Sequence, residues 1–333
     1  MIPRSFYRVA AYARFLAPTT SLLILLAAVL CGADEIFAFQ EGNAIFVRLP
    51  QILFLPLLGF LSGKIPTYLS DHLLLRKAAG LGWEDARKYL AEYEKSIEWS
   101  EKMQDYFLLL FSAGSLFLFF FAPSPGVLVF STFAFLLTLG FSTDYDPRSF
   151  FPLFTLHSEK VLNLAVAGRL SESVTELARA VEFLDCYISW KFPGYQLRED
   201  VAPRVEDETV KMILGPRGEE RYVSLLSRIS AGVSEETILS TLRGESRDRE
   251  SIAVVRDTLT VLADLLGGDE TIIAGRPEGD PLSLWLSGAL RWSMKNIKKM
   301  IKLILFVAYV ALLMLSPQLQ PIRELMGLLI GLL

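Results

Sequence analysis

The sequence predicts an all-α polytopic membrane protein, with about five transmembrane helices and a cytoplasmic helical-bundle domain. Apolar runs alternate along the chain with two polar stretches of helical periodicity, at 64–104 and 143–297. About 20 apolar residues cross a hydrocarbon layer as a helix, and each run reaches or approaches that length. The apolar runs are 15–33, 44–62, 106–122, 126–142 and 300–316.

The ends of these runs divide the chain into segments. Within the tail, residues 321–333 are apolar but too short to span, and Pro317 and Pro321 break the preceding helix. We expect it to lie in the interface or to re-enter the membrane, with a partial sixth span as the alternative. The segments are a first transmembrane hairpin 1–63, a cytoplasmic helical segment 64–104, a second transmembrane hairpin 105–142, a cytoplasmic helical domain 143–297, a transmembrane helix 298–316 and the tail 317–333.

Basic residues predict the orientation. They precede the first run, follow the second and crowd the start of the fifth, whereas the turn between the third and fourth has no charge. The protein is expected in the plasma membrane. Because positive charge stays on the cytoplasmic side, the N-terminus and both polar stretches are expected in the cytosol. These residues are Arg4, Arg8, Arg14, Lys64, Arg76, Lys77, Lys295, Lys298, Lys299 and Lys302.

Two helices are expected to run from the cytoplasm into the membrane without a break. One begins with Asp280 as its N-cap and Pro281 in its first turn, and it enters the fifth run. The other enters the third run and carries a coiled-coil-like stripe that would also suit self-association. Such helices either transmit movement or serve as rigid supports. The stripe is Trp83, Ala86, Leu90, Tyr93, Ile97, Ser100, Gln104 and Phe107.

The second polar stretch predicts five or six short helices. A helical pattern over 156–190 is divided at Gly168, and Ser173 with Glu176 reads as a capping box. Residues 191–207 are loop-like, and 210–214 read as a short strand or an extended turn. Further helices are expected at 218–231, 234–243 and 248–266, with Ser234 and Asp248 as caps of the last two.

Charge excludes one class of partner. Residues 143–297 hold 25 acidic against 18 basic residues, a net charge near −7, and an acidic domain repels the phosphates of nucleic acid. Acidic clusters are candidate contacts for a basic protein surface, although solvated charge is the alternative. The clusters are Glu206, Asp207, Glu208, Glu219 and Glu220.

The sequence predicts no catalytic residue, no cofactor and no metal site. Gly267–Gly268–Asp269–Glu270 matches the start of a cyclic-dinucleotide cyclase signature, but it terminates a helix, so a glycine C-cap is the better interpretation. A phosphate-binding loop with a following Lys-Ser/Thr is absent from the sequence. Cys31 and Cys186 have no metal spacing.

The two histidines are candidate metal ligands. His72 and His157, with Asp71 and Glu159 nearby in sequence, could converge on a metal, but spacing alone does not show convergence. Histidines at the membrane surface without a ligand role are the preferred interpretation.

Three residues of the second apolar run are candidates for a membrane function. Arg48 can snorkel to the headgroups, and Pro50 and Pro56 would kink the helix. A kink opens a substrate path or simply changes packing. Few ionisable residues lie inside the runs, which disfavours a pore or an intramembrane enzyme.

The layout resembles the inner-membrane platform proteins of type II secretion and type IV pilus-like machines, especially archaeal ones. Residues 230–239 (SAGVSEETIL), including Gly232, are similar to a turn-and-helix pattern of their cytoplasmic modules, and 80–86 (GLGWEDA) match it less well. The resemblance implies a platform bound by a cytoplasmic ATPase and by pilin-like subunits.

We therefore expect a non-enzymatic membrane scaffold for secretion or pilus assembly, which forms a homo-oligomer in the bilayer. The alternative is an oligomeric channel or transporter with a cytoplasmic regulatory domain, and an intramembrane enzyme ranks third. Arg outnumbers Lys by 21 to 12 and Asn plus Gln total nine, a composition typical of thermophiles and of GC-rich genomes.

Overall fold

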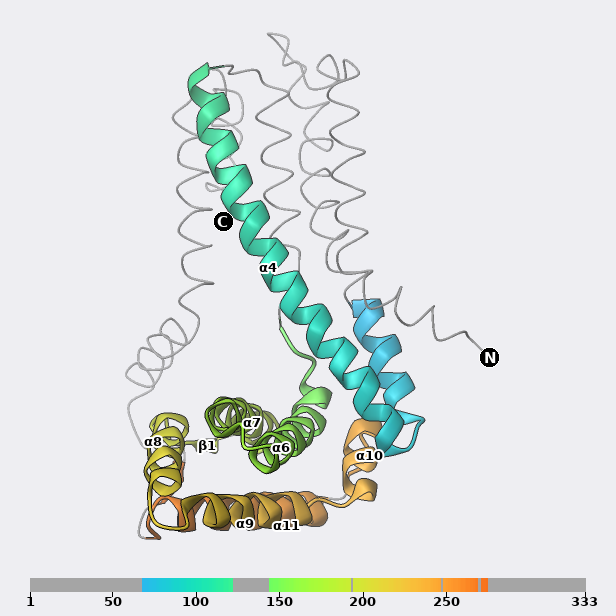
Figure 1. Ribbon diagram of the computed structural model, residues 1–333. Coiled ribbons are helices and arrows are strands. Elements are labelled where there is room, and N and C mark those ends of the chain that lie inside the picture. Colours follow the sequence, from blue (N-terminus) through green and yellow to red (C-terminus); the bar gives the residue numbers. More distant parts are fainter. Residues whose placement is uncertain (1–67, 122–143, 193, 247, 269–270, 275–333) are drawn as a thin grey trace, which may run out of the picture. The chain divides into compact units, whose positions relative to one another are not determined.

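A computed structural model describes residues 68–121, 144–192, 194–246, 248–268 and 271–274 (Figure 1). Four of the predicted spans lie outside these residues, and so do Arg48, Pro50 and Pro56. Within the described residues, no helix combines the length and apolarity that a membrane crossing requires. The described chain is mostly helical, which confirms the all-α part of the predicted fold class.

The chain divides into two compact units. Unit 2 comprises Asp71–Glu94 and Asp144–Gly279, so the helical segment before the second predicted hairpin folds together with the domain after it. The described part of unit 1 is 68–70 and 95–121. Helix α4 begins in unit 2 and continues into unit 1.

Helix α4, Trp83–Phe121, is a single helix of 39 residues, which confirms the predicted continuity into the third apolar run (Figure 1). No glycine or proline occurs between Trp83 and Ala113, so nothing interrupts the backbone hydrogen bonds there. The predicted stripe is buried from Trp83 to Gln104, and Phe107 lies outside the described side chains. Glu84 and Asp85 in the first turn stabilise the helix, because their negative charges lie at the positive end of the helix dipole.

Helix α10, Glu235–Arg243, binds both sides of the turn that precedes α4. Oε1 of Glu235 accepts a hydrogen bond from the backbone N–H of Trp83 at 2.9 Å, and Nε of Arg243 donates to the carbonyl of Ala79 at 2.9 Å. Residues 68–79 are helical, so these side chains satisfy free backbone groups at a helix end and at a helix start. The two stretches with the turn-and-helix pattern therefore lie in contact.

Replacing Glu235 with alanine is expected to lower the free energy of unfolding of unit 2 by about 1 kcal/mol, the usual cost of a lost helix cap. Glu236→Ala is the matched control, because both glutamates lie in the first turn of α10 and only Glu235 caps α4. Thermal unfolding followed by circular dichroism measures both. Equal losses in the two variants would show that the cap contributes nothing.

Helices α6, Phe150–Val166, and α7, Leu170–Lys191, form a packed pair in unit 2. A short 3-10 helix, η1 at Pro147–Ser149, leads into α6. Gly168 has φ 73° between the two helices, which confirms the predicted break. The capping box was wrong: Ser173 lies inside α7, where its buried hydroxyl donates to the carbonyl of Val161 at 2.8 Å and bonds Tyr222.

The predicted strand at 210–214 was also wrong, because these residues end helix α8, Val201–Leu214. The loop predicted at 191–207 is wrong after Asp200, because α8 begins at Val201. Pro203 is compatible with the helix, since it lies in the first turn, where its missing N–H costs no hydrogen bond. Before α8, strand β1, Gln196–Leu197, pairs antiparallel with β2, Ile273–Ala274.

Three further helices match the predicted ranges. They are α9, Gly218–Ala231, α10 and α11, Asp248–Leu265, and Figure 1 shows α9 and α11 side by side. Ser234 caps α10 as expected, since its hydroxyl accepts from the N–H of Thr237 at 3.2 Å. Gly267 and Gly268 end α11 at φ 94° and 82°, which confirms the glycine C-cap.

Candidate functional site

Three helices of unit 2 meet at a buried ionic cluster. Nδ1 of His157 on α6 is hydrogen-bonded to Oε2 of Glu176 on α7 at 2.6 Å. On the other side of the ring, Nε2 lies 2.8 Å from Oε1 of Glu94 on α4. Nζ of Lys160 donates to the second oxygen of Glu94 at 2.9 Å. We call these four residues the His157 cluster.

The position of His157 on α6 explains its burial. It shares the buried face of this helix with Phe154 and Val161, three residues before it and four after it. Its side chain is 0% exposed, and its ring stacks on Phe183 of α7 with centroids 5.2 Å apart. The expectation of a membrane-surface histidine was therefore wrong for His157.

The surroundings shift the pKa values of Glu94, His157 and Glu176 in the directions that favour their charged forms. Burial raises the pKa of Glu94, but its contacts with His157 and Lys160 together lower it to about 2. Burial lowers the pKa of His157, and the carboxylates of Glu176 and Glu94 more than reverse this, so its pKa is raised. The hydrogen bond from His157 is the largest influence on Glu176 and lowers the pKa of that carboxyl.

The cluster is thus expected to hold two carboxylates and two cations below the raised pKa of His157. Buried charges are costly to desolvate, and the cost is offset only when opposite charges and hydrogen bonds are in place. A balanced cluster at the meeting point of α4, α6 and α7 therefore fixes these helices in one arrangement, because a displaced helix leaves a buried charge unpaired.

A second set of contacts fastens α4 to α6 near the start of α4. The indole N–H of Trp83 donates to Glu159, and Nη1 of Arg87 lies 3.7 Å from the same carboxylate. Nearer the cluster, the hydroxyl of Tyr93 accepts from the backbone N–H of Asp146 at 2.7 Å. The part of α4 that belongs to unit 2 is therefore held by polar contacts over its whole length, from Trp83 to Glu94.

The structure does not bring together the residues that were weighed as metal ligands. The carboxylates beside His157 are Glu94 and Glu176 rather than Asp71 and Glu159, whose carboxylate instead binds Trp83. Within the described residues, no group of three or more His, Cys, Asp or Glu side chains could hold a metal ion. Cys186 is half-buried.

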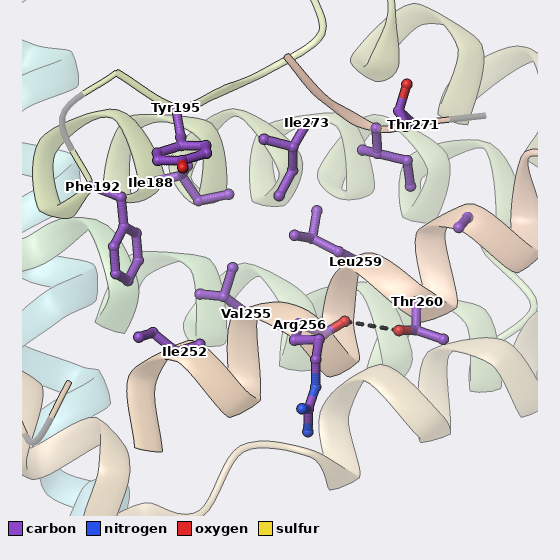
Figure 2. Close-up of a pocket in the computed structure, with 12 residues that line it drawn as sticks. Ile188, Phe192, Tyr195, Ile252, Val255, Arg256, Leu259, Thr260, Thr271 and Ile273 are labelled. Atoms are coloured by element: carbon purple, nitrogen blue, oxygen red, sulfur yellow. Dashed lines mark hydrogen bonds between the residues drawn. The ribbon is translucent and has the colours of Figure 1, made fainter. Parts of the chain in front are cut away.

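An open apolar hollow of about 660 Å³ lies along α11. Figure 2 shows Val255 and Leu259 of α11 facing Ile188 and Ile273, while Arg256 extends away from the hollow. None of the lining residues is a histidine, cysteine, lysine or carboxylic acid, so the hollow offers mainly apolar contact, with Tyr195 and Arg256 as its titratable residues. The lining is Ile188, Phe192, Tyr195, Ile252, Val255, Arg256, Leu259, Thr260, Ala263, Thr271, Ile272 and Ile273.

The acidic residues predicted to contact a partner lie on α8 and α9, which pack against each other. Glu206 and Asp207 are exposed, whereas Glu208 is half-buried and binds Lys211 at 2.6 Å. Glu219 and Glu220 are exposed in the first turn of α9. These side chains are accessible to a partner, apart from the paired Glu208.

Gly232 caps the C-terminal end of α9 and is exposed. Its φ of −75° is available to every residue, and an added Cβ would lie 3.7 Å from the nearest carbonyl oxygen, an ordinary contact. The backbone therefore does not require glycine here.

No protein-family model, curated protein or solved structure matches this chain.

Sequence reasoning missed the His157 cluster because its members are far apart along the chain. Two signals were nevertheless present. Glu94 follows Leu90 by four residues and so falls on the buried side of α4, and His157 falls on the apolar face of α6. A charged or titratable residue on a buried helical face needs a partner, which predicts a buried ionic contact but not which residues form it.

Proposed function

We propose that this protein is a non-enzymatic membrane scaffold that couples a cytoplasmic partner to the membrane, as the platform of a secretion or pilus-like assembly machine. One observation carries the proposal. The 39-residue helix α4 is fixed in unit 2 at its start and continues without a break through the apolar sequence of the third predicted span. A helix held in this way moves with the domain that holds it.

The two ends of α4 indicate that movement would pass from unit 2 to the apolar end of the helix. Its first 12 residues, Trp83–Glu94, belong to unit 2 and are fixed by the His157 cluster and by Glu159. Its last 15 residues, 107–121, carry no charge and include five leucines and six phenylalanines. Such a sequence favours a lipid environment. Movement of unit 2 in the cytosol would therefore displace this helix within the bilayer.

Exposed acidic side chains support the proposal that the cytoplasmic partner has a basic surface. Glu206, Asp207, Glu219 and Glu220 offer negative charge on α8 and α9, which would attract a basic surface and speed its association. In the proposed machine the partner is a cytoplasmic ATPase. Pilin-like subunits would contact the membrane spans, and copies of the chain would associate with one another.

Purification from native membranes tests the proposal. The tagged chain, extracted in a mild detergent and cross-linked, is expected to bring with it a hexameric-type ATPase or pilin-like subunits, identified by mass spectrometry. The double variant Glu206→Lys/Asp207→Lys is expected to reduce ATPase recovery about tenfold, since each reversed charge adds repulsion to a lost attraction.

The matched control is Glu182→Lys/Glu250→Lys, which reverses two exposed charges on α7 and α11 instead. It should recover as much ATPase as the wild type. Recovery of the chain alone as a homo-oligomer contradicts the scaffold, and ion or solute flux in liposomes would then favour the channel or transporter.

A further inference from the structure

The two nitrogens of His157 are not equivalent. Nδ1 forms a hydrogen bond to Glu176 on α7, whereas Nε2 lies 2.8 Å from Glu94 on α4 at an angle outside hydrogen-bond geometry. The contact with α7 is therefore a directed hydrogen bond, and the contact with α4 depends mainly on the positive charge of the ring.

Loss of one proton affects these contacts unequally. A neutral imidazole keeps a single N–H, and the aligned bond to Glu176 retains it at Nδ1. Nε2 then presents a lone pair to the carboxylate of Glu94, and the attraction becomes a repulsion. Lys160 remains beside Glu94, but its side chain is 37% exposed, so this pair is partly screened by solvent.

We propose that His157 is a proton-dependent switch that holds α4 against α6 when protonated and releases Glu94, and with it this part of α4, when neutral. The bond between α6 and α7 persists in both states. The switch controls how firmly unit 2 holds the helix, and it does not depend on which partner or cargo the protein serves.

The groups around the ring come from each neighbouring helix. Glu94 belongs to α4, Lys160 to α6, and Glu176 to α7, where Arg179 lies 3.7 Å from the second oxygen of Glu176. Farther out, Asp146 and Arg148 beside η1 pair with each other, and Tyr222 of α9 bonds Ser173. Within this set, His157 is the group whose ordinary pKa lies nearest neutrality, and its surroundings raise that pKa.

The direction of the pH dependence follows from the raised pKa of His157. The contribution of its charge to stability is fully present below the unfolded value of 6.5 and is lost as pH rises through the higher folded value. On the acid side, Glu94 contributes above its unfolded value of 4.5 and loses that contribution as pH falls toward about 2. The switch therefore opens with rising pH.

Hydrogen exchange of the full chain in one detergent tests the switch, with rates corrected for the intrinsic effect of pH. Between about pH 6 and about pH 9, protection of residues 83–94 should fall by up to about tenfold per pH unit in the window between the two His157 values. Protection of residues 176–188 on α7 should stay constant. Equal loss on both helices, or no loss on α4, overturns the proposal.

Three variants distinguish the proposed switch from a general loss of stability. Glu94→Gln removes the carboxylate that senses the ring and should abolish the pH dependence of α4 protection. His157→Gln should show the open, pH-independent state. His72→Gln removes the other histidine of the chain and should keep the wild-type response. A wild-type response in Glu94→Gln contradicts the assignment even if His157→Gln fails to fold.

Discussion

Gly218→Ala is expected to unfold unit 2 or to lower its free energy of unfolding by about 4 kcal/mol or more. A Cβ built on Gly218 lies 2.0 Å from the carbonyl oxygen of Met212 and 2.5 Å from that of Ile213. Both are backbone atoms of α8, so neither can rotate aside as a side chain would. The turn between α8 and α9 is already strained, because Arg217 has φ 56°.

The measurement is thermal or urea unfolding of the full chain, followed by circular dichroism. Gly232→Ala is the control, since it makes the same chemical change at the other end of α9, where the nearest atom to the new Cβ is 3.7 Å away. This variant should unfold like the wild type. A Gly218→Ala protein as stable as Gly232→Ala would show that α8 and α9 do not meet in this way.

His157→Leu is expected to lower the free energy of unfolding by about 3–5 kcal/mol, the usual cost of removing one partner from a buried charge network. The change leaves the carboxylates of Glu94 and Glu176 on either side of an apolar side chain, with Lys160 as the remaining cation of the cluster. The pKa of Glu94 should rise as a result, because the contact with His157 helps to lower it. Unfolding at about pH 7 measures the loss.

Two comparisons make this result specific. Lys88→Ala breaks an exposed pair with Asp85 on the same helix α4 and should cost less than about 0.5 kcal/mol. The triple change of His157, Glu94 and Glu176 to leucine should recover much of the loss, because the charge that remains, Lys160, has a side chain 37% exposed to solvent. A His157→Leu protein that unfolds like Lys88→Ala would contradict the electrostatic role of the cluster.

Helical periodicity predicted most of the described fold. The stripe on α4 is buried as expected, because its residues recur every three or four positions on one side of a helix. Ser234 and Gly168 were read correctly because a helix start and a helix break leave local signals in the sequence. Four of the predicted spans lie outside the described residues, and the sequence of the remaining one continues α4.

The failures have local causes too. Residues 210–214 are mostly apolar, which suggested a short strand or an extended turn, yet they end helix α8, where Val210 is 41% and Leu214 is 81% exposed. Ser173 and Glu176 have the spacing of a capping box but face two different partners, Val161 and His157, inside the fold. Short motifs do not contain the tertiary contacts that decide between these outcomes.

The His157 cluster lay beyond sequence reasoning for the same reason. Lys160 and Glu94 are 66 residues apart in sequence, and His157 and Glu176 are 19 apart. Only the packing of α6 against α4 and α7 brings them together. The sequence could show that Glu94 and His157 fall on buried helical faces, but it could not show that they face each other.

Whether one rigid helix joins unit 2 to the apolar sequence is tested most directly by a distance within α4. Spin labels at Lys88→Cys and Tyr106→Cys, in a chain with Cys31 and Cys186 changed to serine, both occupy exposed positions. They are 18 residues apart, about five turns, so they lie on one face with backbones roughly 27 Å apart. Pulsed electron–electron double resonance should give a single narrow distribution of distances between the two spin labels, in detergent and in lipid. A broad distribution, or a second shorter distance, would mean that the helix bends between the two units and cannot transmit movement.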